Sequence, residues 1–149
     1  MKTNSPRLAL MLLGIVSLAA CGGYSSGPAG NGDGNLVAGT YTGSVNGTAD
    51  SQPFTLNVTF TLVQSGDSFN GTFTTNDTGG SASGTVNGLN VTFTINQTSP
   101  CNGTFTGAGT ISSSGGRITG SYSGTSPCTG PVSAAFVVDR VAGTGPPGY

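Results

Sequence analysis

Residues 54–62 read Phe-Thr-Leu-Asn-Val-Thr-Phe-Thr-Leu, a strict alternation of apolar and polar side chains. Successive side chains of a β-strand point to opposite faces, so this period of two is typical of a strand with one buried face. The alternation recurs between residues 37 and 141, and all seven phenylalanines fall on the apolar face. No helical period competes with it there. The chain is therefore predicted to form an all-β domain.

Three short turn signals indicate how the strands pair. Gly66-Asp67, Asn87-Gly88 and Ser114-Gly115 each predict a two-residue hairpin turn. In every hairpin the apolar residues of both strands then share one face, an agreement that a slip of one residue would destroy. The three turns place these residues opposite each other: Phe60 and Phe73, Val86 and Leu89, Ile111 and Ile118.

Two cysteines test the third hairpin independently. Extending its register outward places Cys101 directly opposite Cys128, and each cysteine follows a Ser-Pro pair. Disulfides form in the oxidising compartments that exported chains enter, so we expect a structural bridge. A redox-active pair would need surroundings that lower a thiol pKa, which this charge-poor segment does not offer.

The strand count predicts the architecture. The three hairpins supply six strands, and strands at residues 39–46 and 132–141 precede and follow them. Eight antiparallel strands joined in chain order predict an up-and-down barrel, with a β-sandwich of the same strands as the alternative. The second face of each strand consists of Thr, Ser and Asn, which could not face lipid. We therefore expect the apolar face inside, and not a transmembrane barrel.

The two ends of the predicted barrel carry a family resemblance. Gly39-Thr40-Tyr41 opens the first strand and Arg140 lies near the end of the last. This pattern resembles the lipocalin and avidin-like barrels, in which a Gly-x-Trp motif packs its tryptophan against an arginine of the final strand. The resemblance implies a cation–π contact between Tyr41 and Arg140. No residues match the biotin-binding set of avidins, so the resemblance implies an architecture and no ligand.

The N-terminal residues resemble a lipoprotein signal. Lys2 and Arg7 precede a short apolar run, which ends in Leu18-Ala19-Ala20-Cys21. These four residues resemble the lipobox of bacterial lipoproteins, which implies cleavage before Cys21, a diacylglyceryl thioether on its sulfur and usually an N-acyl chain. Gly22 stands where retention in the inner membrane usually needs Asp, so the family rule implies an outer-membrane protein facing the periplasm or the cell surface. The alternative is an ordinary cleaved signal that leaves Cys21 as a free thiol.

The chain thus divides into four predicted segments. Gly- and Ser-rich composition predicts a flexible tether after the cysteine, and Pro146 and Pro147 lie in a predicted disordered tail. The segments are residues 1–20 (signal peptide), 21–36 (lipidated cysteine and linker), 37–141 (β-barrel domain) and 142–149 (tail).

Composition disfavours several classes of function. Removing residues 1–20 leaves two arginines and five aspartates, a net charge of −3, with no histidine and no glutamate. A nucleic-acid-binding surface needs clustered basic residues, and the usual general bases and metal ligands include histidine and glutamate. We therefore expect no nucleic-acid partner, no metal, no cofactor and no catalytic residues.

The remaining hypotheses concern the barrel interior. Longer loops, at residues 47–53, 76–80, 97–100 and 125–130, are predicted at the end opposite the tether. Barrel mouths are common ligand sites, so we expect a small apolar ligand there. The alternative is a barrel filled by its own phenylalanines, which would suit a structural lipoprotein or one with an envelope protein as partner. The predicted lining residues of the mouth are Phe54, Ile95, Phe105, Tyr122 and Val132.

Overall fold

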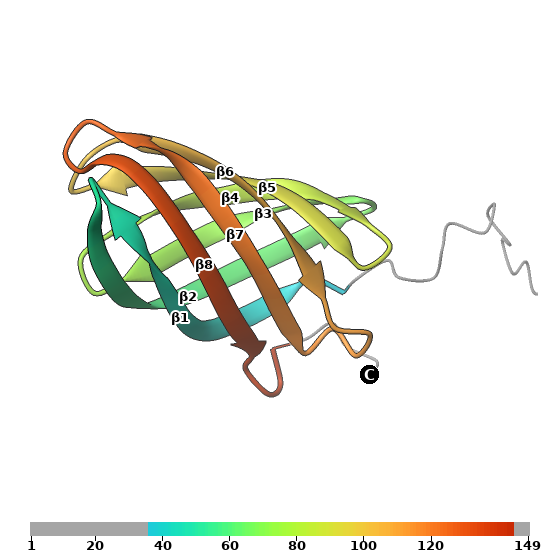
Figure 1. The fold of residues 1–149 in the computed structure, drawn as a ribbon. Helices are drawn as coiled ribbons and strands as arrows, with labels where there is room; N and C mark the ends of the chain where they lie inside the picture. The colour runs from blue at the N-terminus through green and yellow to red at the C-terminus, as the bar shows by residue number, and fades with distance from the viewer. Residues whose placement is uncertain (1–35, 145–149) are drawn as a thin grey trace, which may run out of the picture.

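A computed structural model of the protein describes residues 36–144, which form a closed barrel (Figure 1). Its eight strands run antiparallel in chain order, so the predicted fold is confirmed and the sandwich alternative is wrong. No helix in this range is long and apolar enough to cross a membrane. The strands are β1 (Gly39–Ala49), β2 (Gln52–Ser65), β3 (Ser68–Thr75), β4 (Gly79–Asn87), β5 (Asn90–Ser99), β6 (Gly103–Ile111), β7 (Arg117–Ser126) and β8 (Gly130–Arg140).

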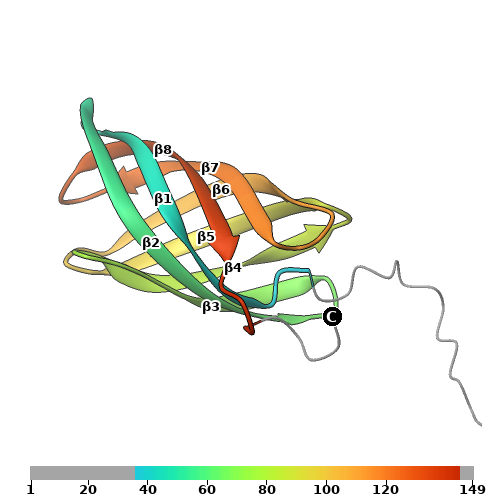
Figure 2. The ribbon, with the colours of Figure 1, turned by 90° about the horizontal axis from the view of Figure 1, so that it is seen from below.

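Closure depends on the pairing of the first strand with the last. β1 pairs with β2 on one side and with β8 on the other, from Tyr41 opposite Arg140 to Ala49 opposite Val132. The view in Figure 2 shows β1 lying between these two neighbours. Among the described strands none keeps an open edge. An open edge offers unpaired backbone groups to other chains, and this Thr-rich surface carries little charge to prevent such pairing.

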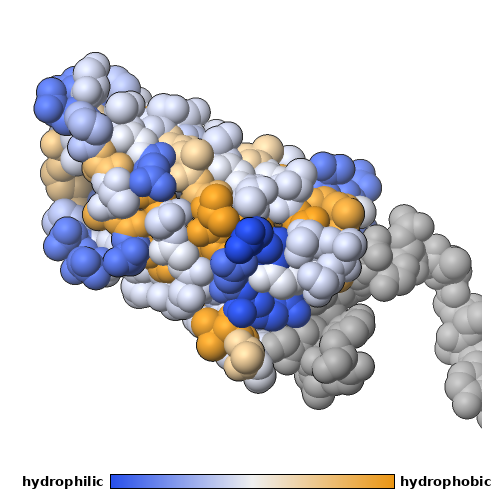
Figure 3. Space-filling model, turned by 60° about the horizontal axis from the view of Figure 1, so that its bottom comes forward, coloured by the Kyte–Doolittle hydropathy of each residue, from blue (hydrophilic) through white to orange (hydrophobic). Residues whose placement is uncertain are grey.

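The alternating apolar and polar residues of the strands face the inside and the outside of the barrel, respectively. The apolar residues of every strand contribute to one interior cluster, whereas Thr, Ser and Asn cover the exterior. Figure 3 shows one side of this exterior, mostly pale, with apolar residues in orange and a blue hydrophilic group. Large apolar side chains that remain exposed are Val63, Leu89, Val137 and Val141.

Two of the three predicted hairpin registers are confirmed. Phe60 pairs with Phe73 across the turn at Gly66-Asp67. Ile111 pairs with Ile118, although the turn between them is wider than two residues and is closed by Gly115 N–H donating to the Ser112 carbonyl at 2.7 Å.

The predicted turn at Asn87-Gly88 is wrong by one position. Asn87 pairs with Asn90, so Val86 lies opposite Val91 instead of Leu89. Gly88, with a φ of 60°, takes the first central position of the turn, where a positive φ favours glycine. Each partner shifts by two residues, so the apolar faces still coincide. Face agreement alone could not distinguish the two registers.

The loops divide between two ends. Residues 50–51, 76–78, 100–102 and 127–129 connect strands at one end, hereafter the mouth end. Leu36, the first described residue, lies at the other end, hereafter the closed end, where its carbonyl accepts a hydrogen bond from Arg140. The predicted long loop at residues 47–53 is wrong. Asp50 and Ser51 form a tight turn between β1 and β2, with positive φ angles of 46° and 66°. Both strands therefore continue up to the rim of the mouth.

Residues just outside the strands cover the closed end. Val37 is only 1% exposed, and its N–H donates to the Gln64 side-chain oxygen at 3.0 Å. Thr144, within the predicted tail, accepts a hydrogen bond from Thr40 N–H at 3.1 Å and donates one to the Val141 carbonyl at 2.6 Å. The contacts of the barrel thus extend to Thr144, beyond the predicted boundary at residue 141.

Candidate functional site

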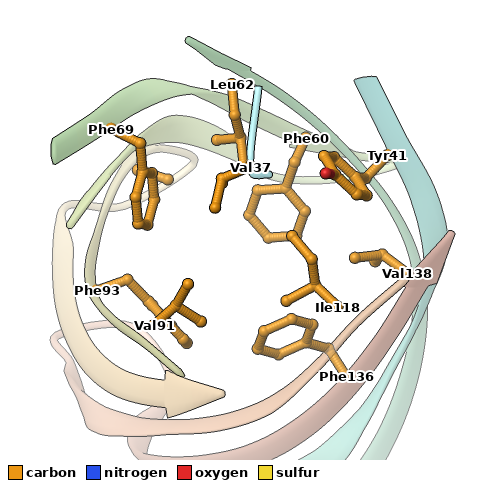
Figure 4. A pocket seen from close by; sticks show the side chains of 11 residues that line it. Val37, Tyr41, Phe60, Leu62, Phe69, Val91, Phe93, Ile118, Phe136 and Val138 are labelled. Carbon is orange, nitrogen blue, oxygen red and sulfur yellow. The ribbon is translucent and has the colours of Figure 1, made fainter. Parts of the chain in front are cut away.

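The barrel interior is packed in its closed half. Side chains from all round the wall point inward there and leave a space of only about 30 Å³ (Figure 4). Phe60, Phe69, Phe93 and Phe136 contribute aromatic rings to this lining, together with aliphatic side chains such as Val37. This half has the character of a protein core.

Glycines in the wall make room for these rings. Phe93 pairs across strands with Gly107, and a Cβ at Gly107 would lie 2.6 Å from the end of its ring. A Cβ at Gly120 would likewise lie 2.9 Å from the ring of its partner Phe136. A real Cβ does not come so close, so the inward glycines and the phenylalanines fill the interior jointly.

The half at the mouth end is hollow. A cavity of about 240 Å³, hereafter the mouth cavity, lies between Phe60 and the rim. All five residues predicted to line a mouth contribute to its wall, each from its own strand: Phe54 (β2), Ile95 (β5), Phe105 (β6), Tyr122 (β7) and Val132 (β8). The interior of this half is therefore not filled by phenylalanines.

Other residues of the lining were not predicted from the sequence. Val45, Leu56 and Val58 belong to the apolar faces of β1 and β2, so the same alternation could have found them. The rim residues carry no periodic signal because they lie where strands end. The polar or loop residues of the lining are Thr75, Thr78, Gln97, Pro100, Cys128 and Thr129.

Phe60 forms the floor of the mouth cavity. It is the one described residue that lines both the packed space and the mouth cavity. Its ring centroid lies 6.1 Å from that of Phe73 and 6.1 Å from that of Phe136, with both pairs tilted. These distances are typical of favourable aromatic contacts, so the floor is a packed layer of rings.

Tyr122 brings a polar group to this apolar wall. Its ring packs edge-on against Phe105, with centroids 5.8 Å apart. None of the hydrogen bonds among residues 36–144 involves its hydroxyl, and burial raises the pKa of Tyr122 to about 12. The phenol therefore remains protonated at neutral pH and can donate a hydrogen bond.

The rim is crosslinked by the predicted disulfide, which is confirmed. Cys101 and Cys128 join the β5–β6 loop to the β7–β8 loop, with Cα atoms 6.2 Å apart. Beneath the bridge, Ser126 is 1% exposed and its hydroxyl accepts a hydrogen bond from Cys128 N–H at 3.3 Å. The bridge therefore holds two of the four mouth loops together.

Charges lie outside the mouth cavity. Its lining contains no ionisable side chain except Tyr122. At the closed end, Arg117 forms two hydrogen bonds to Asp139, of 2.7 Å and 3.0 Å, which lower the pKa of that carboxyl. Both side chains are more than half exposed, at 57% and 56%, so this pair belongs to the surface.

The implied contact between Tyr41 and Arg140 is present at the closed end. The guanidinium carbon lies 5.2 Å from the ring centroid, and Arg140 Nε donates to the Tyr41 hydroxyl at 3.0 Å. That hydroxyl lies 2.9 Å from the Leu36 carbonyl and 3.1 Å from the Gly115 carbonyl, and it can donate to one at a time. Burial raises the pKa of Tyr41, and the hydrogen bond from Arg140 opposes that shift. These contacts fix Leu36 and the start of β1 to the end of β8.

The residues predicted to form a lipobox, including Cys21, lie outside the described residues. No protein-family model matches the chain. No curated protein matches it either. Among solved structures it is similar to the crystal structure of a protein of unknown function of the DUF3598 family from Nostoc punctiforme, with a TM-score of 0.45 and 15% sequence identity. That alignment covers 71% of this chain, which spans about half (48%) of the other.

Proposed function

We propose that the protein is a lipid-anchored lipoprotein of the bacterial envelope whose barrel binds a small, mainly apolar ligand in the mouth cavity. The observation that carries this proposal is the open cavity of about 240 Å³ above a barrel half that leaves a space of only about 30 Å³. Empty space of this size costs stability, since a filled interior would gain van der Waals contacts. A binding function accounts for that cost.

The lining favours a mainly apolar ligand. Phe54, Leu56 and Ile95 are typical of its wall, and polar side chains are confined to Tyr122 and the rim. Apolar walls with a few polar groups are characteristic of small-molecule sites, and burying apolar surface contributes roughly 25 cal/mol per Å². The volume is below the roughly 300–1,000 Å³ of pockets for drug-sized molecules, which favours a ligand with about one ring.

The anchor supports an orientation for this site. If Cys21 carries the lipid, the chain leaves the membrane and reaches the barrel at Leu36, whose carbonyl accepts a hydrogen bond from Arg140 at the closed end. The mouth cavity opens at the opposite end. The ligand would then enter from the side that faces away from the anchoring membrane.

Native mass spectrometry of the mature protein, gently extracted from membranes, tests the binding function. We expect an adduct of defined mass that disappears in Ala49→Phe, because Ala49 lines the mouth cavity and a phenyl ring there would occupy it. The matched control is Thr48→Phe, which places the same phenyl ring on the exterior and should keep the adduct. A bare mass from every preparation would instead favour the alternative, a structural or protein-interaction lipoprotein.

The anchor is tested separately. Mass spectrometry of the N-terminal peptide should find Cys21 as the first residue, carrying a diacylglyceryl group. Cys21→Ser should abolish both the modification and the retention in the membrane fraction. An unmodified N-terminal peptide with a free thiol would contradict this part of the proposal.

A further inference from the structure

We propose that the ligand of the mouth cavity is a neutral molecule with an apolar body and one hydrogen-bond acceptor, and that Tyr122 donates its hydroxyl proton to that acceptor. The inference rests on the function proposed above and adds the chemical class of the ligand. It is carried by the position of one side chain, by the state of its hydroxyl and by the absence of charge from the lining.

Tyr122 is held in place by its neighbours. It lies on the inward face of β7, between the exposed residues Ser121 and Ser123. Its cross-strand partners are small, Gly107 on β6 and Ala134 on β8, and so leave room for its ring. The edge-on contact with Phe105 then restricts the ring. Its hydroxyl therefore belongs to a rigid part of the wall, and not to a loop.

The hydroxyl of Tyr122 is free to bind a ligand. No fully buried side-chain oxygen or nitrogen among residues 36–144 lacks a hydrogen-bond partner. Because the Tyr122 hydroxyl has no such partner, it must retain some accessible surface, and Tyr122 is a lining residue of the mouth cavity. Tyr41 is a useful contrast, because its buried hydroxyl is already bonded to Arg140 and lies close to backbone carbonyls.

Protonation makes this hydroxyl a donor. The raised pKa of Tyr122, about 12, keeps the proton in place across the physiological range. A partly buried phenol without a protein partner loses hydrogen bonds to bulk water. An acceptor on the ligand would restore one bond.

The charge distribution disfavours an ionic ligand. In the described range both arginines, Arg117 and Arg140, lie at the closed end, whereas the mouth loops contain Asp50 and Asp77. A carboxylate in the cavity would have no cation to pair with, and a cation would find no carboxylate in the lining. Burying an unpaired charge is costly, so a neutral ligand is favoured.

The other polar side chains of the rim are less suited to this role. The Thr75 hydroxyl accepts hydrogen bonds from Thr78 N–H at 2.9 Å and Asp77 N–H at 3.2 Å, which hold it within its own loop. Gln97 and Thr129 remain as further donors at the rim. Gln97 is the rival donor with which Tyr122 is compared.

Three one-ring probes distinguish a neutral ligand with an acceptor from a neutral ligand without one and from an anionic ligand. Acetophenone has a carbonyl acceptor, α-methylstyrene has the same shape without an acceptor, and benzoate is anionic. Binding is measured by NMR titration of the full chain carrying Cys21→Ser, in the forms with Tyr122, Tyr122→Phe and Gln97→Leu. Spectra of the free variants establish that each is folded before the probes are added.

We expect Tyr122→Phe to weaken acetophenone binding roughly threefold to tenfold, the range of one neutral hydrogen bond, and to leave α-methylstyrene unchanged. Gln97→Leu, which alters the rim, should weaken acetophenone binding less than Tyr122→Phe does, and benzoate should bind weakest. Equal effects of Tyr122→Phe on both neutral probes, tighter binding of benzoate, or a loss confined to Gln97→Leu would each overturn this inference while the cavity remains a binding site. If none of the probes binds to the form with Tyr122, both the inference and the proposed function fail.

Discussion

The ring of Phe93 lies over its cross-strand partner Gly107, so close that a Cβ on the glycine would come within 2.6 Å of the ring. The same relationship recurs around the barrel. Each of these glycines removes a side chain from the wall where a phenyl ring from the next strand covers the backbone. The further pairs are Phe69 with Gly84, Phe73 with Gly80, Phe105 with Gly124 and Phe136 with Gly120.

This relationship predicts that Gly107→Ala destabilises the barrel by roughly 1–3 kcal/mol, the usual cost of overpacking a core. The new methyl group would meet the ring of Phe93 and also the Ser121 carbonyl, 2.2 Å away. Urea denaturation of the parent protein and of Gly107→Ala gives the difference between their unfolding free energies. Gly79→Ala is the control, because a Cβ there would lie an ordinary 3.5 Å from its nearest neighbour, the Phe73 carbonyl. Equal stability of the two alanine variants would contradict the prediction.

The two described tyrosines should respond differently to loss of the hydroxyl. Tyr41 is 0% exposed and its hydroxyl bonds to Arg140 and the backbone, so Tyr41→Phe should cost about 1–3 kcal/mol of unfolding free energy. Tyr122→Phe removes a hydroxyl without a protein partner and should change stability by less than about 0.5 kcal/mol. Thermal or urea denaturation of both variants and of the parent protein measures these changes in unfolding free energy. A larger loss in Tyr122→Phe would mean that its hydroxyl has a structural partner.

Alkaline pH should weaken the folded state through Tyr122. Its pKa is raised from 10.0 to about 12 by burial, so the folded protein holds this proton more tightly than the unfolded chain. The stabilisation is complete below pH 10 and is lost as the pH rises toward 12. Unfolding free energies measured across this interval should fall more steeply for the form with Tyr122 than for Tyr122→Phe. Parallel curves would show that the phenol is not buried as described.

The disulfide should contribute about 3–4 kcal/mol by restricting the unfolded chain, given the 27 residues that separate its cysteines. Replacing both Cys101 and Cys128 by serine should lower the urea midpoint accordingly. Adding a reductant should lower the midpoint of the parent protein but not that of the double variant. Intact mass spectrometry without reductant should find the parent two hydrogens lighter than its reduced form. An unchanged mass after reduction would contradict the bridge.

Much of the fold could be predicted because its signals are discrete. Alternation assigns each residue to one of two faces, and the cysteines confirmed one register because only one alignment brings Cys101 opposite Cys128. Of the two hairpins without such a marker, the one between β2 and β3 was predicted correctly and the one between β4 and β5 was not. At the β4–β5 turn a shift by two residues preserves both faces, and Gly88 takes a positive φ in either register, so neither signal could distinguish the two registers.

The site was less accessible to sequence reasoning. Five lining residues could be placed because strand order and alternation determine which apolar side chains lie near the mouth. Whether a cavity remains depends on where the rings of residues such as Phe93 and Phe136 lie over the glycines of the wall. The alternation of apolar and polar residues does not predict the positions of these rings. That the Tyr122 hydroxyl has no hydrogen-bond partner in the described residues could not be predicted either, because such partners depend on neighbours in three dimensions.

The floor formed by Phe60 also has an evolutionary consequence. Substitutions above it alter what fits into the mouth cavity, whereas the rings of Phe60, Phe93 and Phe136 pack against one another at and below it. Selection could therefore change the proposed ligand preference without first having to repair this part of the fold. The same separation recommends this barrel as a starting scaffold for laboratory evolution, with libraries restricted to the lining between Phe60 and the rim.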